Sequence, residues 1–182
     1  MLKKRKIFLK NAAVEIKKLN LGSGIDYREG WINLDLGNKN IYGKKIKVDV
    51  IHDLNKFPYP FSDNYFEEIW MDQVLEHLEE PLKVMKELIR ISKDNAIITV
   101  RVPHFSHFKA FYDPTHKHFF SLDSINLMNY DCEIIKKEFE ISDNPFVKMI
   151  GKIFTLSPKM YERFLYGYFP VLGIEWVLKV KK

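Results

Sequence analysis

Short apolar segments recur along this chain, the first three of them ending near glycine or an acidic residue, and they constrain its fold more than any other feature. They cover residues 14–22, 31–36, 46–54, 67–75 and 95–103. The last one, NAIITVRVP, is an almost uninterrupted apolar run, which is typical of a strand covered on both faces of a parallel sheet. The pattern therefore predicts five strands in this part of the chain.

Helical spacing stands between the fourth and fifth of these segments. In EEPLKVMKELIRIS, residues 79–92, apolar side chains recur every three or four positions, and Pro81 suits the first turn of a helix. The stretch SLDSINLMNY, residues 121–130, predicts a shorter helix capped by Ser121. The apolar positions of the first helix are Leu82, Met85, Leu88 and Ile89.

Two further strands are predicted over residues 132–142 and 174–182, where apolar and polar residues alternate. Strands and helices that alternate along a chain favour an α/β fold with a mainly parallel sheet and helices on both sides. The length of 182 residues suits one domain that spans 1–182.

Composition argues against several other classes of protein. The single cysteine, Cys132, excludes an internal disulfide and fits a reducing compartment. No apolar run is long enough to cross a bilayer, and the first residues lack the apolar core of a signal peptide, so we expect a cytoplasmic protein. The net charge of +5 is spread along the chain, so we expect no nucleic-acid partner.

Ligand-binding residues are expected where the first three strands end. Gly22 and Gly24 follow the first strand directly, so a ligand can approach the backbone closely. Asp35 ends the second strand, where a carboxylate can accept hydrogen bonds from ribose hydroxyls, and Asp53 can accept one from an exocyclic amine. Because ligands of open α/β sheets bind beyond the carboxyl ends of the strands, we predict a site for an adenosine-containing ligand.

The segments LNLGSG, GWINLDL, VDVIHDL and DQVLEHL occur in this order, and with them the chain resembles the class I S-adenosylmethionine-dependent methyltransferases, in particular their small type 11-like branch. The resemblance covers roughly residues 17–142. It implies a Rossmann-like three-layer sandwich with a mainly parallel seven-strand sheet, whose antiparallel last strand would be residues 174–182. It also implies S-adenosylmethionine as the cofactor, held by Gly22, Ser23, Gly24, Asp35, Leu36, Asp53, Leu54, Asp72 and Gln73.

The sequence departs from the family pattern after the glycine turn. Ile25 and Asp26 stand where a third glycine is usual, and Asp35 follows Gly22 by only 13 positions. Since a parallel crossover usually takes a dozen or more residues, the first crossover helix must be cut to about one turn. The segment before the third strand, GNKNIYGKK, is similarly short.

Two alternatives to a methyltransferase remain at this point. A nicotinamide-dependent oxidoreductase would use the same glycine turn, but it needs the third glycine and a helix whose amino end faces a pyrophosphate. A protein that binds an adenosine ligand without catalysis would satisfy the same motifs. The resemblance favours methyl transfer, with a small-molecule acceptor such as a sugar or lipid-linked hydroxyl.

Candidates for proton transfer lie just beyond the fifth strand, in PHFSHFKAFYDPTHKHFF, residues 103–120. Histidine titrates near neutrality and can take a proton from a hydroxyl. We expect His104 to be the general base, with His107 and His116 as the next candidates, and Asp113 to orient one of them. The alternative is that these histidines only cap loops or pack against neighbouring phenylalanines.

We expect no metal site, because ligand spacing on a loop does not fix geometry and no cysteine accompanies it. His77, in LEHL, belongs to the family pattern and is expected to support the cofactor pocket. The potential ligands considered are His104, His107, Asp113, His116 and His118.

Residues 144–173 separate the last two predicted strands, where a short hairpin would suffice. Apolar residues recur at helical spacing before and after Ser157–Pro158, which predicts a pair of helices. This insert is expected to act as a lid or a homodimer contact, or to contact a membrane surface or a lipid chain. Its apolar stripes are Met149, Ile150, Ile153 and Phe154, then Tyr161, Phe164, Leu165 and Tyr168; its basic residues are Lys148, Lys152, Lys159 and Arg163.

Overall fold

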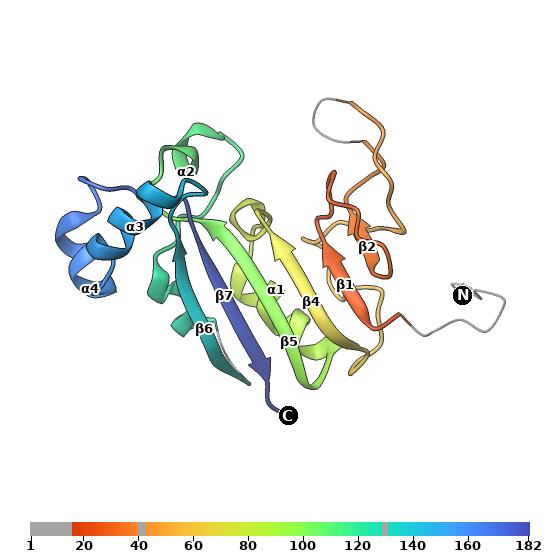
Figure 1. Ribbon diagram of the computed structural model, residues 1–182. Helices are drawn as coiled ribbons and strands as arrows, with labels where there is room; N and C mark the ends of the chain where they lie inside the picture. Colours follow the sequence, from red (N-terminus) through yellow and green to blue (C-terminus); the bar gives the residue numbers. More distant parts are fainter. Residues whose placement is uncertain (1–15, 40–42, 129–130) are drawn as a thin grey trace, which may run out of the picture.

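The computed structural model describes residues 16–39, 43–128 and 131–182, and its seven strands form one sheet (Figure 1). The spatial order is β3-β2-β1-β4-β5-β7-β6. The strands are β1 (Lys18–Leu21), β2 (Ile32–Asp35), β3 (Val50–Ile51), β4 (Phe66–Asp72), β5 (Ser92–Pro103), β6 (Cys132–Glu140) and β7 (Gly173–Val180).

The strand directions confirm the expected fold class. β1 pairs in parallel with β2 and β4, while β2–β3 and β4–β5 are also parallel pairs. β7 is antiparallel to both of its neighbours, β5 and β6. The last strand is therefore the antiparallel one, as the resemblance implied.

Most helical segments of the described chain are short. They are η1 (Leu75–His77), α1 (Pro81–Ile91), α2 (Phe108–Tyr112), η2 (Leu122–Leu127), α3 (Pro145–Phe154), α4 (Pro158–Met160) and η3 (Tyr161–Leu165). η2 is a 3-10 helix with a capping box between Ser121 and Ser124, so the predicted cap at Ser121 is confirmed. Positions 129 and 130 of the predicted helix lie outside the described residues, as do positions 14 and 15 of the first predicted strand.

Helix α1 confirms the strongest helical pattern, although the apolar Leu82 is exposed and the acidic Glu87 is buried. Leu82 is 49% exposed rather than part of the core, because it lies in the first turn at the rim of a cavity. Glu87 is 8% exposed, since its carboxylate accepts hydrogen bonds from the Tyr59 backbone N–H and from the Arg90 guanidinium. A paired carboxylate can be buried where an unpaired one cannot.

The third predicted strand, residues 46–54, is reduced to Val50–Ile51. Its partner among the described residues is β2, which offers Leu34 and Asp35 before that strand ends. Strand length here follows from the partner's length, which apolar patterning does not report.

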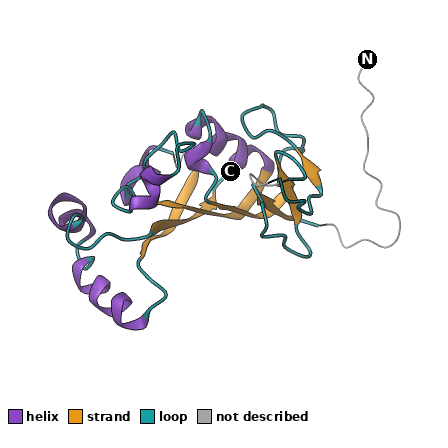
Figure 2. Ribbon diagram, turned by 90° about the horizontal axis from the view of Figure 1, so that it is seen from above, coloured by secondary structure: helices purple, strands orange, loops and turns teal. Residues whose placement is uncertain are grey.

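The helices between the parallel strands cover mainly one face of the sheet. Seen from above, α1 and its neighbours lie on one side, with the two helices of the insert at one end (Figure 2). Along β5, alternate residues face this core, where Ile98, Val100 and Val102 are fully buried, whereas Thr99 and Arg101 on the opposite face are half-buried.

The second helical layer of the expected sandwich is reduced. Residues 22–31, between β1 and β2, form turns without a helix, and the described residues between β2 and β3 have none either. The short spacing from Gly22 to Asp35 predicts this loss, and the structure extends it from about one turn to no helix at all.

Polar side chains replace the missing first crossover helix. The Asn20 amide donates to Asn33 Oδ1 at 3.0 Å, and the backbone N–H and side-chain amide of Asn33 both donate to Asp49 Oδ2, at 2.8 and 3.0 Å. Burial alone would raise the pKa of Asp49, but hydrogen bonds from Asn33 and Tyr27 hold it below the usual value. This network fixes the turn between β1 and β2, which carries the glycines.

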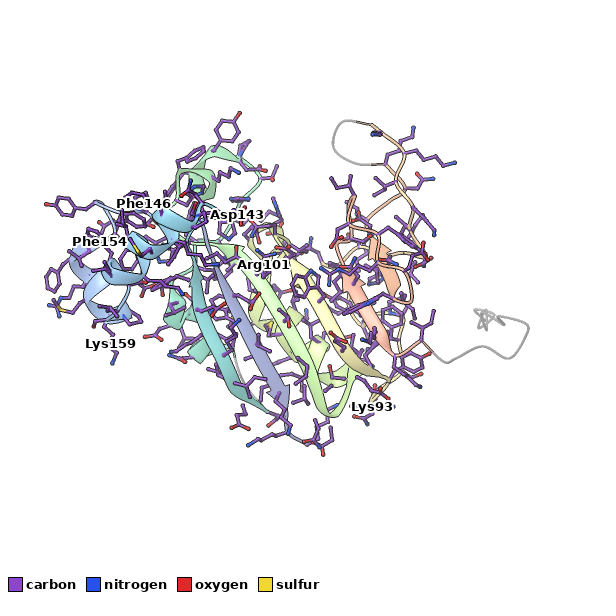
Figure 3. All side chains as sticks on the ribbon, viewed as in Figure 1. Lys93, Arg101, Asp143, Phe146, Phe154 and Lys159 are labelled. Carbon is purple, nitrogen blue, oxygen red and sulfur yellow. The ribbon has the colours of Figure 1, made fainter. Side chains whose placement is uncertain are left out.

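The insert consists of α3 followed by α4 and η3, which confirms the predicted pair of helices. Figure 3 labels Phe146, Phe154 and Lys159 on it, apart from Arg101 in the sheet. It packs on a small separate core around Ile141, Tyr161 and Val171, to which Phe154 contributes. Among the helices of the described residues, none combines the length and the apolar character needed to cross a membrane.

Candidate functional site

The carboxyl ends of the parallel strands bring the predicted ligand-binding residues together at one edge of the sheet, at the top of Figure 1. The chain leaves β1 through Gly22, with φ +63°, and Gly24, with φ +48°. A Cβ at Gly22 would lie 2.3 Å from Val74 Cγ2. Only glycine fits there, because the conformation disfavours other residues and the neighbouring side chain leaves no room for one.

Asp35 at the end of β2 holds this turn. Its Oδ2 accepts a hydrogen bond from the Gly24 backbone N–H at 2.8 Å, and its Oδ1 accepts one from the Leu36 N–H at 2.8 Å. A carboxylate has about four acceptor positions, so each oxygen can accept one more hydrogen bond from a ligand. Asp35 therefore both shapes the glycine turn and remains able to bind a diol.

A cavity of about 520 Å³ extends from this turn across the strand tips, and we call it the glycine-turn cavity. It includes six of the nine residues expected to hold the cofactor, namely Gly22, Asp35, Leu36, Asp53, Leu54 and Gln73. His52, Asn55, Val74, His77, Leu78, Asp113 and Thr115 complete its lining. The structure thus brings most of the predicted cofactor residues to one cavity.

The other three expected cofactor residues lie elsewhere. Gly24 lines a neighbouring hollow with Asp35, whereas Ser23 is 3% exposed and belongs to neither cavity wall. Asp72 points to the far side of the strand tips, where its carboxylate pairs with Arg101 at 3.0 Å. Burial raises the pKa of Asp72 although Arg101 opposes the shift. Ser23 and Asp72 are therefore placed to support the cavity rather than to line it.

A second cavity of about 360 Å³ lies beside the first, and we call it the histidine cavity. Gln73, His77 and Asp113 line both cavities. Its other lining residues are Glu76, Pro103, Phe108, Lys109, Tyr112 and His116. The segment after β5 therefore faces the glycine-turn cavity from the position expected of an acceptor site.

His104, the first choice for a general base, is sealed inside the protein. It has no exposed surface, Nδ1 accepts a hydrogen bond from the Ser106 N–H at 3.1 Å, and Nε2 donates one to Glu162 at 3.0 Å. Both ring nitrogens are thus used within the protein, and His104 lines neither cavity. The expectation of a catalytic base is contradicted here, because a residue of the insert, 58 positions later, occupies the nitrogen that would act.

His107 also lies outside the histidine cavity. It is 8% exposed and lines a small hollow with Asp72 and Arg101. Burial lowers its pKa, and the charge of Lys109 lowers it further. Of the three histidines proposed from the sequence, only His116 opens onto the histidine cavity.

Asp113 contacts a histidine through an intermediary, and this histidine is not one of the three that it was expected to orient. Its Oδ1 accepts hydrogen bonds from the backbone N–H and the hydroxyl of Thr115, at 2.8 and 2.6 Å. The Thr115 oxygen lies 2.9 Å from His77 Nδ1. The oriented ring is therefore that of His77, which lines the glycine-turn cavity as expected.

Glu76 is the residue of this site that sequence reasoning missed. It has no exposed surface, and burial raises its pKa to about 8. Its backbone oxygen accepts hydrogen bonds from the N–H groups of Lys117 and His118, at 2.8 and 3.3 Å, and these tie η1 to the segment after α2. In the sequence Glu76 is one acid among several, and nothing local marks it as buried.

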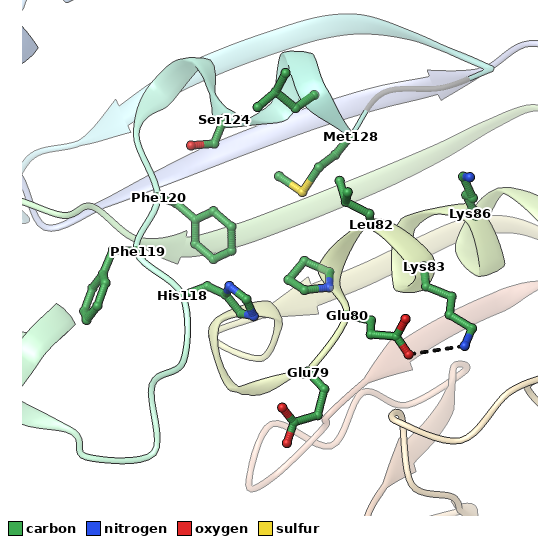
Figure 4. Close-up of a pocket in the computed structure, with 12 residues that line it drawn as sticks. Glu79, Glu80, Leu82, Lys83, Lys86, His118, Phe119, Phe120, Ser124 and Met128 are labelled. Atoms are coloured by element: carbon green, nitrogen blue, oxygen red, sulfur yellow. Dashed lines mark hydrogen bonds and ion pairs between the residues drawn. The ribbon is translucent and has the colours of Figure 1, made fainter.

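A third cavity, of about 730 Å³, lies apart from the glycine turn, between the start of α1 and η2 (Figure 4). His118 lines it together with Phe120 and Met128. His118 and His116, two positions apart, thus face different cavities. This separation removes His118 from the group of potential ligands considered from the sequence.

Comparisons with known proteins agree with this architecture. Residues 19–100 match the family model of a methyltransferase domain. The search of curated proteins gives no match.

Solved structures with the same fold include enzymes of more than one activity. The chain is similar to a SAM-dependent methyltransferase from Archaeoglobus fulgidus, with a TM-score of 0.62 and 17% identity over 91% of this chain and 88% of that one. It is also similar to a phosphoethanolamine N-methyltransferase 2 from Haemonchus contortus in complex with phosphomonomethylethanolamine and S-adenosylhomocysteine. The TM-score is 0.57 and the identity 15%, over 90% of this chain and 48% of that one. A third similar structure is that of the [4+2]-cyclase SpnF, with a TM-score of 0.60 and 13% identity over 91% of this chain and 74% of that one. The matched segment and the shared fold agree with the resemblance of this chain to the class I S-adenosylmethionine-dependent methyltransferases.

Proposed function

We propose that this chain transfers a methyl group from S-adenosylmethionine to an oxygen of a small molecule, with a sugar or lipid-linked hydroxyl as our candidate acceptor. The observation that carries the proposal is that the glycine-turn cavity and the histidine cavity share Gln73, His77 and Asp113. Ligands in the two cavities would meet at this common wall. Methyl transfer needs such an arrangement, because the protein mainly has to align donor and acceptor for an in-line displacement.

The glycine-turn cavity fits the cofactor. Its volume of about 520 Å³ lies within the range of cofactor sites. A Cβ at Gly24 would meet only the Gly22 oxygen, at 3.9 Å, so a ligand can approach the turn from that side. Asp35 would receive the ribose hydroxyls and Asp53 the adenine amine. When bound, S-adenosylmethionine supplies a methyl group activated by a sulfonium.

The histidine cavity suits a polar acceptor. Lone pairs of His77 and His116 and the carboxyl of Glu76 can interact with a hydroxyl. Phe108 and Tyr112, which are 64% and 80% exposed, form an aromatic rim that an acceptor would cover. Covering this rim would exclude water from the common wall.

The absence of a helix after the glycine turn argues against the nicotinamide alternative. A dinucleotide needs a helix amino end to face its pyrophosphate, and residues 22–31 have no helix. S-adenosylmethionine has no phosphate and makes no such demand. The cyclase among the similar structures keeps another class open, since one fold can host different reactions.

Titration calorimetry with the cofactor, its demethylated product and NAD tests the proposal. We expect saturable binding of S-adenosylmethionine and S-adenosylhomocysteine and none of NAD. A screen with methyl-labelled cofactor against sugars and lipid-linked sugars should then give a labelled product whose methyl group mass spectrometry assigns to oxygen.

Each contrary result points to a different alternative. Binding without a labelled product from any metabolite pool would favour a non-catalytic module. Preference for NAD would favour an oxidoreductase, and a label on nitrogen would overturn the choice of oxygen.

We also propose that the insert, residues 144–173, contacts an anionic membrane surface. It exposes large apolar side chains beside basic ones. Glu162 ties the insert to the end of β5 through His104 and to the Leu122 N–H. Such a contact would bring a lipid-linked acceptor near the strand tips. The exposed apolar residues include Phe146, Met149, Ile153, Leu156, Phe164 and Tyr168, and the basic ones are Lys148, Lys152, Lys159 and Arg163.

Co-sedimentation with vesicles of phosphatidylcholine, with and without phosphatidylserine, tests this contact. We expect the parent chain to bind only the anionic vesicles, and the Ile153→Asp, Phe164→Asp variant to lose most of this binding. Both side chains are more than half exposed, so the fold should survive. Leu127→Asp, at a 79% exposed position outside the insert, is the matched control.

Lack of binding by the parent, or equal binding by the variant, would refute the membrane contact. A dimer in light scattering that the variant loses, without vesicle binding by the parent, would identify the insert as a homodimer contact instead.

A further inference from the structure

The Glu76 carboxylate is buried without a partner at the wall of the histidine cavity. Its side chain is 1% exposed, and neither of its oxygens has a hydrogen-bond partner among the described residues. An ionised carboxylate in such a place is unfavourable unless a proton or a cation compensates its charge. No lysine or arginine is paired with it in the described structure, but two histidine rings lie next to it.

The first ring, His116, presents Nε2 to this carboxylate. His116 Nδ1 lies 2.9 Å from the Ala110 carbonyl oxygen, which can only accept, so Nδ1 carries the hydrogen. Nε2 is left with its lone pair, 4.0 Å from Glu76 Oε1. The ring is 8% exposed and its orientation is fixed by this backbone contact.

The second ring, His77, is fixed in the same tautomer. The Thr115 hydroxyl donates its hydrogen to Asp113, so its oxygen accepts one from His77 Nδ1. The Nε2 atom of His77 therefore also keeps its lone pair. The His77 and His116 ring centroids are 4.6 Å apart.

We propose that Glu76, His77 and His116 bind a divalent transition-metal ion such as Zn²⁺. One ligand atom from each of the three lies within 4.8 Å of the other two, a spacing that a small contraction around an ion would close. Metal-bound histidines typically donate their other ring N–H to a carbonyl or a carboxylate system. Ala110 provides that contact for His116, and Thr115 with Asp113 provides it for His77.

Two histidines and one carboxylate are a ligand set of Zn²⁺ and Fe²⁺ sites that keep coordination positions open. Those positions would face the histidine cavity, since all three residues line it. Under the proposed function the acceptor oxygen could take one of them, but metal binding does not depend on methyl transfer. The sequence alone suggested no such site, because Glu76 and His77 precede α1 whereas His116 follows β5 and α2.

Titration of the tag-free, EDTA-treated full chain with Co²⁺ tests the proposal. Visible d–d absorption should saturate at one ion per chain, and Zn²⁺ should displace Co²⁺. Glu76→Gln and His116→Ala should abolish the signal. Thr115→Ala removes, at an exposed position, the hydroxyl that links Asp113 to His77, and it should weaken the affinity about 10-fold. His118→Ala is the matched control and should bind like the parent.

Circular dichroism of each variant separates metal loss from unfolding, and Thr115→Ala keeps the test decisive if the buried variants do not fold. The proposal is overturned if the parent shows no saturable Co²⁺ or Zn²⁺ binding. It is equally overturned if folded Glu76→Gln and His116→Ala retain full affinity, or if His118→Ala loses as much affinity as they do. None of these results depends on whether the chain transfers a methyl group.

Discussion

Replacement of Asp35 by alanine is expected to weaken the binding of S-adenosylmethionine about 100-fold. Two hydrogen bonds from ribose hydroxyls to a carboxylate contribute about 3 kcal/mol together, and each 1.4 kcal/mol corresponds to a factor of ten. The variant also frees the Gly24 N–H, which Asp35 now binds at 2.8 Å, so the turn loses its anchor. Titration calorimetry with S-adenosylmethionine and S-adenosylhomocysteine measures the effect.

Two further variants separate the ligand contact from the turn. Asp35→Asn keeps an acceptor oxygen for one of the backbone N–H groups but lacks the charge, so its loss of affinity should be intermediate. Asp26→Ala changes an aspartate of the same loop that lines neither cavity and is 62% exposed. Its affinity should stay at the parent value. If Asp35→Ala bound the cofactor as tightly as the parent, the ribose assignment would be wrong.

Replacement of Gly22 by alanine should destabilise the protein by about 2–5 kcal/mol. Two effects add. The positive φ of +63° disfavours any residue with a Cβ, and the new Cβ would lie 2.3 Å from Val74 Cγ2. Urea unfolding followed by tryptophan fluorescence measures the loss, and cofactor affinity should fall with it because Gly22 lines the glycine-turn cavity.

A double-mutant cycle separates the two effects. In Gly22→Ala, Val74→Ala the clash is removed, so the loss should be smaller than the sum of the two single losses by about 1–3 kcal/mol. Gly24→Ala, whose Cβ would meet only the Gly22 oxygen at 3.9 Å, should show the conformational cost alone, about 1–2 kcal/mol. Equal losses for Gly22→Ala and Gly24→Ala would contradict the role assigned to Val74.

Patterning along the chain predicted all seven strands, helix α1, the cap of η2 and the helical insert. These elements share one property, which is that the periodic burial of apolar side chains produces a local signal. The signal is weaker where a partner decides the length, as for the two-residue strand β3, whose extent follows from β2. The apolar pattern also does not indicate that Glu87 is buried, because this burial depends on hydrogen bonds from Arg90 and from the Tyr59 N–H.

The structure gathers the predicted cofactor residues at one place more completely than the predicted acceptor residues. Gly22, Asp35 and Asp53 lie at or within two positions of the ends of adjacent parallel strands, and sheet topology alone brings such positions together. The histidines after β5 lie in a segment whose course depends on distant contacts. His104 is occupied by Glu162 of the insert, whereas His116 reaches the cavity because Lys117 and His118 bind the Glu76 backbone.

The sequence by itself determined the succession of strands along the chain, the shortening of the first crossover connection and the sheet edge at which the candidate ligand-binding residues gather, since each follows from local spacing and from the geometry of parallel sheets. Only the tertiary structure decided which ionisable side chains share the histidine cavity, that Glu76 is buried without a partner, and that His77 and His116 both keep Nε2 free. The physical reason is that burial and hydrogen-bond partners at this site come from segments about 40 residues apart, and no local pattern encodes such pairings.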